Sequence, residues 1–157
     1  MTAIRFLALP TEEVRALQQG GPDAYGREPE RRVSDGSGIP CRHCLTEVPA
    51  GEDYLILAHR PFSSLQPYAE TGPIFLHAKP CERHPESTTT PEMFLGWERL
   101  LVKGYSADER IVYGTGGVVE TERVAAVAAD ILKRPDIAFV DLRSARNNCF
   151  QARVVRA

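Results

Sequence analysis

Residues 41–44 read CRHC and residues 77–84 read HAKPCERH, and the segment between them joins two groups of chemically reactive side chains. Three of the four cysteines and all four histidines of the chain lie within residues 41–84. Thiols and imidazoles are the side chains that bind soft and borderline metals and that act as nucleophiles and bases. This concentration predicts that the functional site is built from the two ends of the segment.

The spacing of these residues is that of a metal site. It runs C-x2-C, then 32 residues, then H-x3-C-x2-H. A C-x2-C turn presents two sulfurs to one ion, and a distant pair of ligands completes a tetrahedron. The predicted metal ligands form a Cys3His set for zinc, with His84 as a substitute for His77: Cys41, Cys44, His77 and Cys81. Two features weigh against it, because Leu45 stands where zinc knuckles usually have glycine and Pro80 constrains the approach of Cys81.

Other interpretations of the thiols remain open. Cys41 and Cys44 could be small buried hydrophobic residues, a common fate of cysteine. They could form a dithiol redox pair, although Leu45-Thr46-Glu47-Val48-Pro49 is a poor start for the helix that such a pair needs. Cys81 with His77 or His84, oriented by Glu70, could form a nucleophile and base, but no oxyanion loop accompanies them.

Length and charge narrow the class of protein. The chain has 157 residues, which predicts a single domain over residues 1–157. A net charge of −2 argues against nucleic-acid binding, which needs a basic surface. No apolar run is long enough for a membrane helix, and the first residues lack the features of a secretory signal. We therefore expect a cytoplasmic protein with no membrane association, in which cysteines are thiols or metal ligands.

The remaining pattern predicts hairpins with a few helices. Predicted strands cover residues 4–9, 54–59, 73–77, 99–105, 110–113, 137–143 and 149–155. One predicted helix follows Thr11 as its N-cap, and a second covers residues 91–95. A third covers residues 121–134, with an apolar stripe of Val124, Val127, Ala128 and Ile131. Residues 23–38 are predicted to be a surface loop. The fold class is therefore α+β, with a mainly antiparallel or mixed sheet and two or three helices.

The last predicted hairpin is rich in polar and cationic residues. Strand alternation places Cys149, Gln151 and Arg153 on one face, and Asp141 and Arg143 also share a face. With Arg146 in the turn, these residues could bind a carboxylate or phosphate through arginine forks. Alternatively, they form the solvated face of an edge hairpin, where arginines discourage pairing with other chains.

A loop before the strand at residues 73–77 holds Tyr68 and Glu70. Loops on rigid strands often carry binding groups, although a capped turn with Gly72 explains the same residues. If the loop, the CRHC segment and the last hairpin converge, they form a pocket for a small, anionic ligand. The predicted ligand-binding residues are Arg42, Tyr68, Glu70, His77, Arg143 and Arg153.

Three segments resemble a bacterial family catalogued as domain of unknown function 1203. They read PCRHCL at residues 40–45, GPIFLH at residues 72–77 and NCF at residues 148–150, and the resemblance covers nearly the whole chain. The resemblance implies a compact bacterial cytoplasmic domain and no particular activity. It also implies that Cys41 and Arg42 are typical, whereas other residues can stand at the positions of Cys44, His77 and Cys81. That favours a pocket around Cys41 and Arg42.

Three functions follow from these patterns. The first is a small-ligand binding domain, whose status as an enzyme the sequence leaves open. The second is a structural or interaction module stabilised by zinc. The third is a structural domain that acts through a partner surface, with scattered cysteines and an exposed apolar patch.

Overall fold

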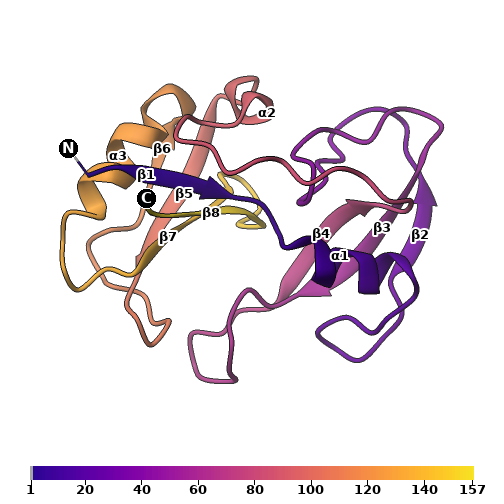
Figure 1. The fold of residues 1–157 in the computed structure, drawn as a ribbon, viewed down its shortest axis with the longest axis horizontal. Coiled ribbons are helices and arrows are strands. Elements are labelled where there is room, and N and C mark those ends of the chain that lie inside the picture. The colour runs from indigo at the N-terminus through magenta and orange to yellow at the C-terminus, as the bar shows by residue number, and fades with distance from the viewer. Residues whose placement is uncertain (1) are drawn as a thin grey trace. The chain divides into compact units, whose positions relative to one another are not determined.

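The computed structural model describes residues 2–157, which divide into two compact units. The five-strand unit comprises residues 2–7, Phe62–Glu70 and Pro85–Ala157. The three-strand unit comprises Ala8–Pro61 and Thr71–His84. Each unit has its own sheet (Figure 1). That residues 1–157 act as a single domain stays a prediction.

The five-strand unit is an antiparallel sheet in the order β1-β8-β7-β5-β6. Its strands are β1 (Ile4–Leu7), β5 (Arg99–Tyr105), β6 (Gly117–Glu120), β7 (Phe139–Ser144) and β8 (Phe150–Arg156). Its helices are α2 (Glu92–Leu95), the 3-10 helix η1 (Thr121–Arg123) and α3 (Val124–Ile131), and α3 lies against the sheet in Figure 1.

The two faces of this sheet differ in polarity because side chains alternate along each strand. The face that packs on α3 is apolar and holds Leu100, Val102, Val140, Leu142, Ala152 and Val154, all buried. Gly104 lies on the same face, and a Cβ there would stand 3.1 Å from Cγ2 of Ile131. The opposite face carries Lys103, Asp141, Arg143 and Arg153, with Asp141 paired to Arg153 across β7 and β8.

Helix α3 buries a different stripe from the predicted one. Val124, Ala128 and Ala129 are buried, as is Leu132 directly after the helix, whereas Val127 and Ile131 are only half-buried. The predicted helix over residues 121–134 is a 3-10 turn followed by α3, which ends at Ile131, and the buried face of α3 includes Ala129 in place of Val127 and Ile131.

Ala128→Asp should therefore destabilise the protein strongly. Ala128 is fully buried against the sheet, so an aspartate there would be an unpaired buried charge that costs about 3 kcal/mol or more. Urea unfolding followed by circular dichroism measures the loss. The matched control is Ala126→Asp on the exposed side of α3, which should change the midpoint little. Equal losses in the two variants would contradict this orientation of the helix.

The three-strand unit is an antiparallel sheet in the order β2-β3-β4, with β2 (Glu30–Val33), β3 (Asp53–His59) and β4 (Gly72–His77). The unit also contains helix α1 (Thr11–Gln18), whose buried residues are Val14 and Leu17. The core side chains Leu55 and Leu57 of β3 alternate with less buried neighbours, as expected for a sheet covered on one side.

The α+β class, the antiparallel pairing and the number of α-helices are confirmed, but three local predictions are wrong. Residues 23–38 contain β2, and residues 110–113 form no strand, only an isolated bridge between Tyr105 and Ile111. The strand that pairs with β5 is instead β6, which was not predicted because it begins in a glycine-rich segment. Thr11 is the first residue of α1 and not its cap, which is Pro10.

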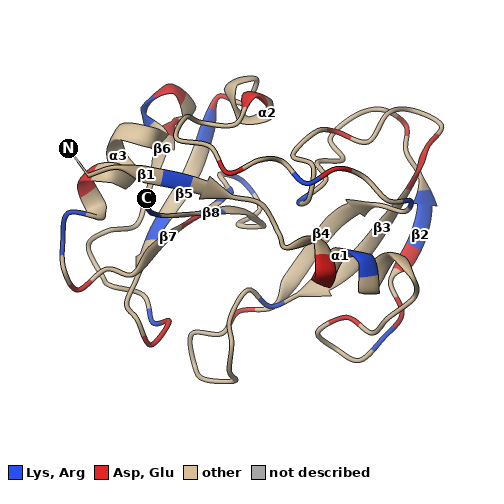
Figure 2. Ribbon diagram, viewed as in Figure 1, with Lys and Arg blue, Asp and Glu red and all other residues tan. Residues whose placement is uncertain are grey.

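Figure 2 shows acidic and basic residues interspersed along the chain, in agreement with a net charge of −2. Within the part of the chain that the structure describes, no helix has the length and apolar character needed to cross a membrane.

Candidate metal centre

A tight loop carries Cys41 and Cys44. Cys41 forms a parallel bridge with Phe75 of β4, which anchors the start of the loop on the three-stranded sheet. The Cys41 N–H donates to the carbonyl of Thr46 at 3.0 Å, and the Leu45 N–H donates to the carbonyl of Cys41 at 3.0 Å. These bonds turn the chain back on itself, so both sulfurs face the same side of the loop.

Leu45 occupies the knuckle position where glycine is usual. Its φ of 52° is left-handed, a conformation that costs a non-glycine residue about 1–2 kcal/mol. The Leu45 side chain is 2% exposed, so burial of an apolar side chain offsets that strain. The leucine therefore fits the turn that glycine makes in other knuckles, and its presence does not argue against a metal site.

The second pair of sulfur and imidazole ligands comes from the end of β4 and the segment after it. His77 is the last residue of β4, and Cys81 follows four residues later. Side chains of α1 hold the backbone of this segment: Gln18 Nε2 donates to the carbonyls of His77 and Lys79 at 2.9 and 3.0 Å, and Arg15 Nη2 donates to the carbonyl of Cys81 at 2.8 Å. The approach of Cys81 is thus fixed by α1.

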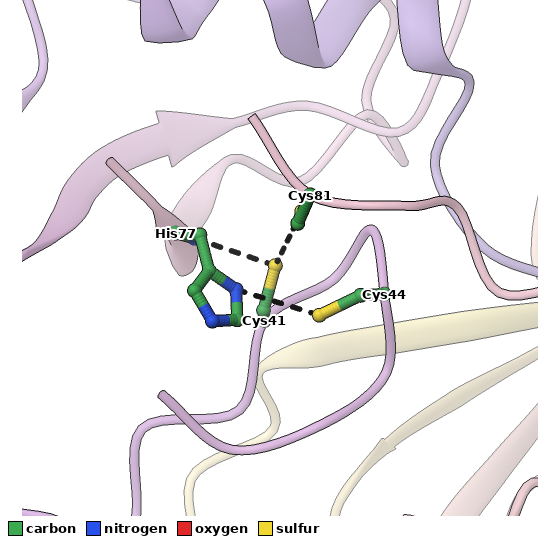
Figure 3. Close-up of side chains that lie close together, drawn as sticks. All are labelled: Cys41, Cys44, His77 and Cys81. Atoms are coloured by element: carbon green, nitrogen blue, oxygen red, sulfur yellow. Dashed lines mark hydrogen bonds between the residues drawn. The ribbon is translucent and has the colours of Figure 1, made fainter. Parts of the chain in front are cut away.

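The four predicted metal ligands come together. One ligand atom from each of Cys41, Cys44, His77 and Cys81 lies within 4.8 Å of all the others. The sulfurs of Cys41 and Cys81 are 3.9 Å apart, and the Cys44 sulfur is 3.4 Å from His77 Nδ1. The cysteines are free thiols, and Figure 3 shows the four side chains gathered together. The cluster is close enough to hold a metal ion, and His84 is not part of it.

These separations suit tetrahedral coordination. With zinc–sulfur bonds near 2.3 Å and zinc–nitrogen bonds near 2.0–2.1 Å, two sulfurs stand about 3.8 Å apart, and a sulfur and a nitrogen about 3.6 Å apart. The observed 3.9 and 3.4 Å lie close to those values. The backbone N–H of His77 also donates to the Cys41 sulfur at 3.3 Å, the kind of contact that stabilises a thiolate.

The electrostatics of the cluster favour one thiolate and oppose three. Hydrogen bonds with the thiols of Cys44 and Cys81 hold the pKa of Cys41 well below its ordinary value. The same contact with Cys41 raises the pKa of Cys44 and of Cys81, and a hydrogen bond with Cys41 raises the pKa of His77. Three thiolates at this distance therefore need a cation between them, which would deprotonate each coordinating thiol.

His43 is a fifth member of the site that the sequence did not identify as such. It is fully buried, with Nδ1 3.1 Å from the Cys81 sulfur and Nε2 2.9 Å from the hydroxyl of Thr11. A Cys81 thiolate only accepts hydrogen bonds, so Nδ1 would donate to it and Nε2 would accept from Thr11. Such a contact orients a metal ligand. Only the fold could reveal it, because Thr11, His43 and Cys81 are far apart in the sequence.

The residues predicted to bind a small ligand fall in both units. Arg42 and His77 belong to the three-strand unit, and Tyr68, Glu70, Arg143 and Arg153 belong to the five-strand unit. Arg42 is buried, donates from Nη1 to the carbonyl of Pro40 at 2.7 Å, and has its guanidinium 5.6 Å from the ring centroid of Phe75. One pocket drawing on all of these residues stays a prediction.

The arginines of the last hairpin differ in their partners. Arg153 makes a bidentate pair with Asp141, at 2.7 and 3.1 Å, and its guanidinium lies 3.7 Å from the ring centroid of Phe139. Arg143 donates from Nη1 to the carbonyl of Asn148 at 3.0 Å. Arg146 is exposed in the turn. Arg143 and Arg153 lie on the same polar face of the sheet, and Arg153 is paired with a carboxylate of that sheet.

Fold and site together define an α+β protein with a Cys3His cluster able to hold a metal ion. A family model described as Protein of unknown function (DUF1203) matches residues 38–156, a range that includes all four cluster residues. The chain belongs to this family, as its three characteristic segments predicted. No curated protein matches the chain, and no solved structure matches it.

Proposed function

We propose that Cys41, Cys44, His77 and Cys81 bind one zinc ion, and that this zinc is structural. The observation that carries the proposal is the convergence of four ligand atoms within 4.8 Å from two segments that 32 residues separate. Three sulfurs and one nitrogen in a tetrahedral arrangement are a donor set typical of structural zinc.

A structural role is favoured over a catalytic one by the number of protein ligands. Catalytic zinc keeps a position open for water or substrate, whereas four protein ligands complete a tetrahedron. Cys41 and His77 are also buried, at 0% and 9% exposure. Cys44 and Cys81 are half-buried, so the complete set of four protein ligands, and not burial alone, leaves no position open for substrate. Such a centre acts by joining the chain segments that supply its ligands.

The consequence for the fold is a cross-link inside the three-strand unit. The ion joins the loop of Cys41 and Cys44 to the end of β4 and to Cys81, and so closes the chain around β3. Structural zinc contributes an apparent binding free energy of about 10–16 kcal/mol near neutral pH, part of which is folding free energy. The unit would then fold fully only with metal, as a zinc-stabilised structural or protein-interaction module.

Cobalt substitution tests the ligand set. Cobalt(II) in a tetrahedral thiolate site gives intense visible bands and sulfur-to-metal charge-transfer absorption, whereas octahedral cobalt is nearly colourless. We expect both signals at one equivalent of cobalt. Cys44→Ser should lower the charge-transfer absorption by roughly a third, because one of three thiolates is lost.

Cys149→Ser is the matched control for this titration. Cys149 is the fourth cysteine and belongs to the five-strand unit, outside the cluster. Its replacement should leave the cobalt spectrum unchanged. A colourless cobalt complex, or equal effects of the two serine variants, would refute the proposed ligands.

A further inference from the structure

The carboxylate of Glu70 is held by three donors from the polar side of the five-strand unit. Lys103 Nζ lies 3.5 Å from Oε1, while Arg143 Nη1 and Asn148 Nδ2 lie 3.6 and 3.4 Å from Oε2. Charge-assisted N–H···O bonds are ordinarily about 2.7–2.9 Å long. The three donors thus converge on one oxyanion position, and Glu70 fills it loosely.

The Arg143 guanidinium has two further donors besides Nη1, which lies near Glu70 and donates to the carbonyl of Asn148 at 3.0 Å. Its side chain is 5% exposed, and its Nε and Nη2 have no hydrogen-bond partner among the described residues. A buried donor without a hydrogen-bond partner costs folding free energy, and a charged donor costs more. Such groups therefore usually contact water, an ion or a ligand. A guanidinium with two free N–H groups on one edge matches the two oxygens of a carboxylate or phosphate.

A buried hydroxyl lies beside this guanidinium. Tyr105 is fully buried, and its hydroxyl makes no well-formed hydrogen bond within the part of the chain that the structure describes, although it is close enough to interact with the side chain of Arg143. Burial raises the pKa of Tyr105 to about 12, and the nearby charge of Arg143 opposes that rise. The phenol is therefore a neutral donor close to Arg143 at neutral pH.

The balance of charge also favours an anion. Arg153 and Asp141 neutralise each other in a bidentate pair. Lys103, Arg143 and Arg153 thus bring three positive charges to this face, against the two carboxylates of Glu70 and Asp141. Glu70 is more exposed than Lys103 and Arg143, at 39% against 17% and 5%, so the solvent reaches the cluster from the Glu70 side.

We propose that Lys103, Arg143 and Asn148, with the Tyr105 hydroxyl, form a binding site for a small carboxylate or phosphate. The carboxylate of Glu70 occupies this site in the free protein and competes with the ligand. The site lies within the five-strand unit and is independent of the metal centre. It assigns the anion preference predicted for the last hairpin to Arg143, and not to Arg153.

Calorimetric titration of the full chain with inorganic phosphate, and separately with acetate, tests the proposal at constant ionic strength. Glu70→Gln removes the competing charge and keeps the shape of the side chain. This variant should bind at least one probe about tenfold more tightly than the wild type, as expected if Glu70 occupies the site about nine-tenths of the time. Phosphate and acetate binding separately identify the class of oxyanion.

Two further variants make the result specific. Glu122→Gln makes the same charge change at an exposed position of η1 and should leave the affinity unchanged. Lys103→Met in the Glu70→Gln background should abolish binding, with circular dichroism confirming the fold. In the wild type, the Nε–Hε NMR signal of Arg143 should shift as the probe is added.

Two outcomes would overturn the proposal. One is no binding of either probe to Glu70→Gln together with an unmoved Arg143 signal in the wild type. The cluster would then serve only to fasten residues 62–70 to the sheet. The other is an equal gain in affinity in Glu122→Gln, which would show that the tighter binding comes from the change in net charge and not from the loss of Glu70 at the site.

Discussion

Cys41→Ser is expected to abolish metal binding and to unfold the three-strand unit. Cys41 is fully buried, and its sulfur lies 3.9 Å from the Cys81 sulfur and 3.3 Å from the backbone nitrogen of His77. Serine is a poor zinc ligand, so the metal's contribution of about 10 kcal/mol or more would be lost, which is comparable with the whole stability of a domain.

Hydrogen exchange of the full chain measures this effect strand by strand. The amides of β3 and β4 should lose protection in Cys41→Ser, and a strong chelator should produce the same loss in the wild type. Cys149→Ser, which removes a thiol from the five-strand unit, should keep both protection and sensitivity to the chelator. Unchanged protection of β3 and β4 in Cys41→Ser would contradict a structural metal.

Asp141→Asn is expected to destabilise the five-strand unit by about 3–5 kcal/mol, the usual cost of removing one partner from a buried ion pair. Asp141 is fully buried and accepts two hydrogen bonds from Arg153, at 2.7 and 3.1 Å. Asparagine keeps the shape but offers one acceptor and no charge, so the guanidinium over Phe139 would lose its counter-ion. Urea unfolding measures the change.

The exposed pair of Asp136 and Arg134 provides the control. Its shortest distance is also 2.7 Å, but both side chains are about half exposed. Solvent screens such a pair, so Asp136→Asn should shift the urea midpoint far less than Asp141→Asn. Similar shifts would show that burial does not set the strength of the Asp141 pair.

Strong local patterns predicted most of the fold. The strand at residues 99–105 and the strands near residues 54–59 and 73–77 agree with β5, β3 and β4, because runs of apolar and β-branched residues specify them. Strand β2 could not be predicted, since its four residues are all exposed and it forms by pairing with β3. Strand β6 begins at Gly117, inside a segment that is typical of a loop.

The sequence predicted the metal ligands of the candidate site but not the residues that hold those ligands in place. The spacing of Cys41, Cys44, His77 and Cys81 predicted the residues that converge. Leu45 argued against the site because zinc knuckles usually have glycine at this position. That expectation does not allow for a leucine whose backbone is left-handed and whose side chain is buried. The contacts of His43 and Gln18 depend on where α1 packs, which no local pattern encodes.

The most direct test of the metal centre is the zinc content of untagged protein purified without chelator, measured by elemental analysis against protein concentration. The proposed centre predicts about one zinc per chain in the wild type and in Cys149→Ser, and almost none in Cys41→Ser. Wild-type protein that is folded and holds no zinc or other transition metal would contradict it.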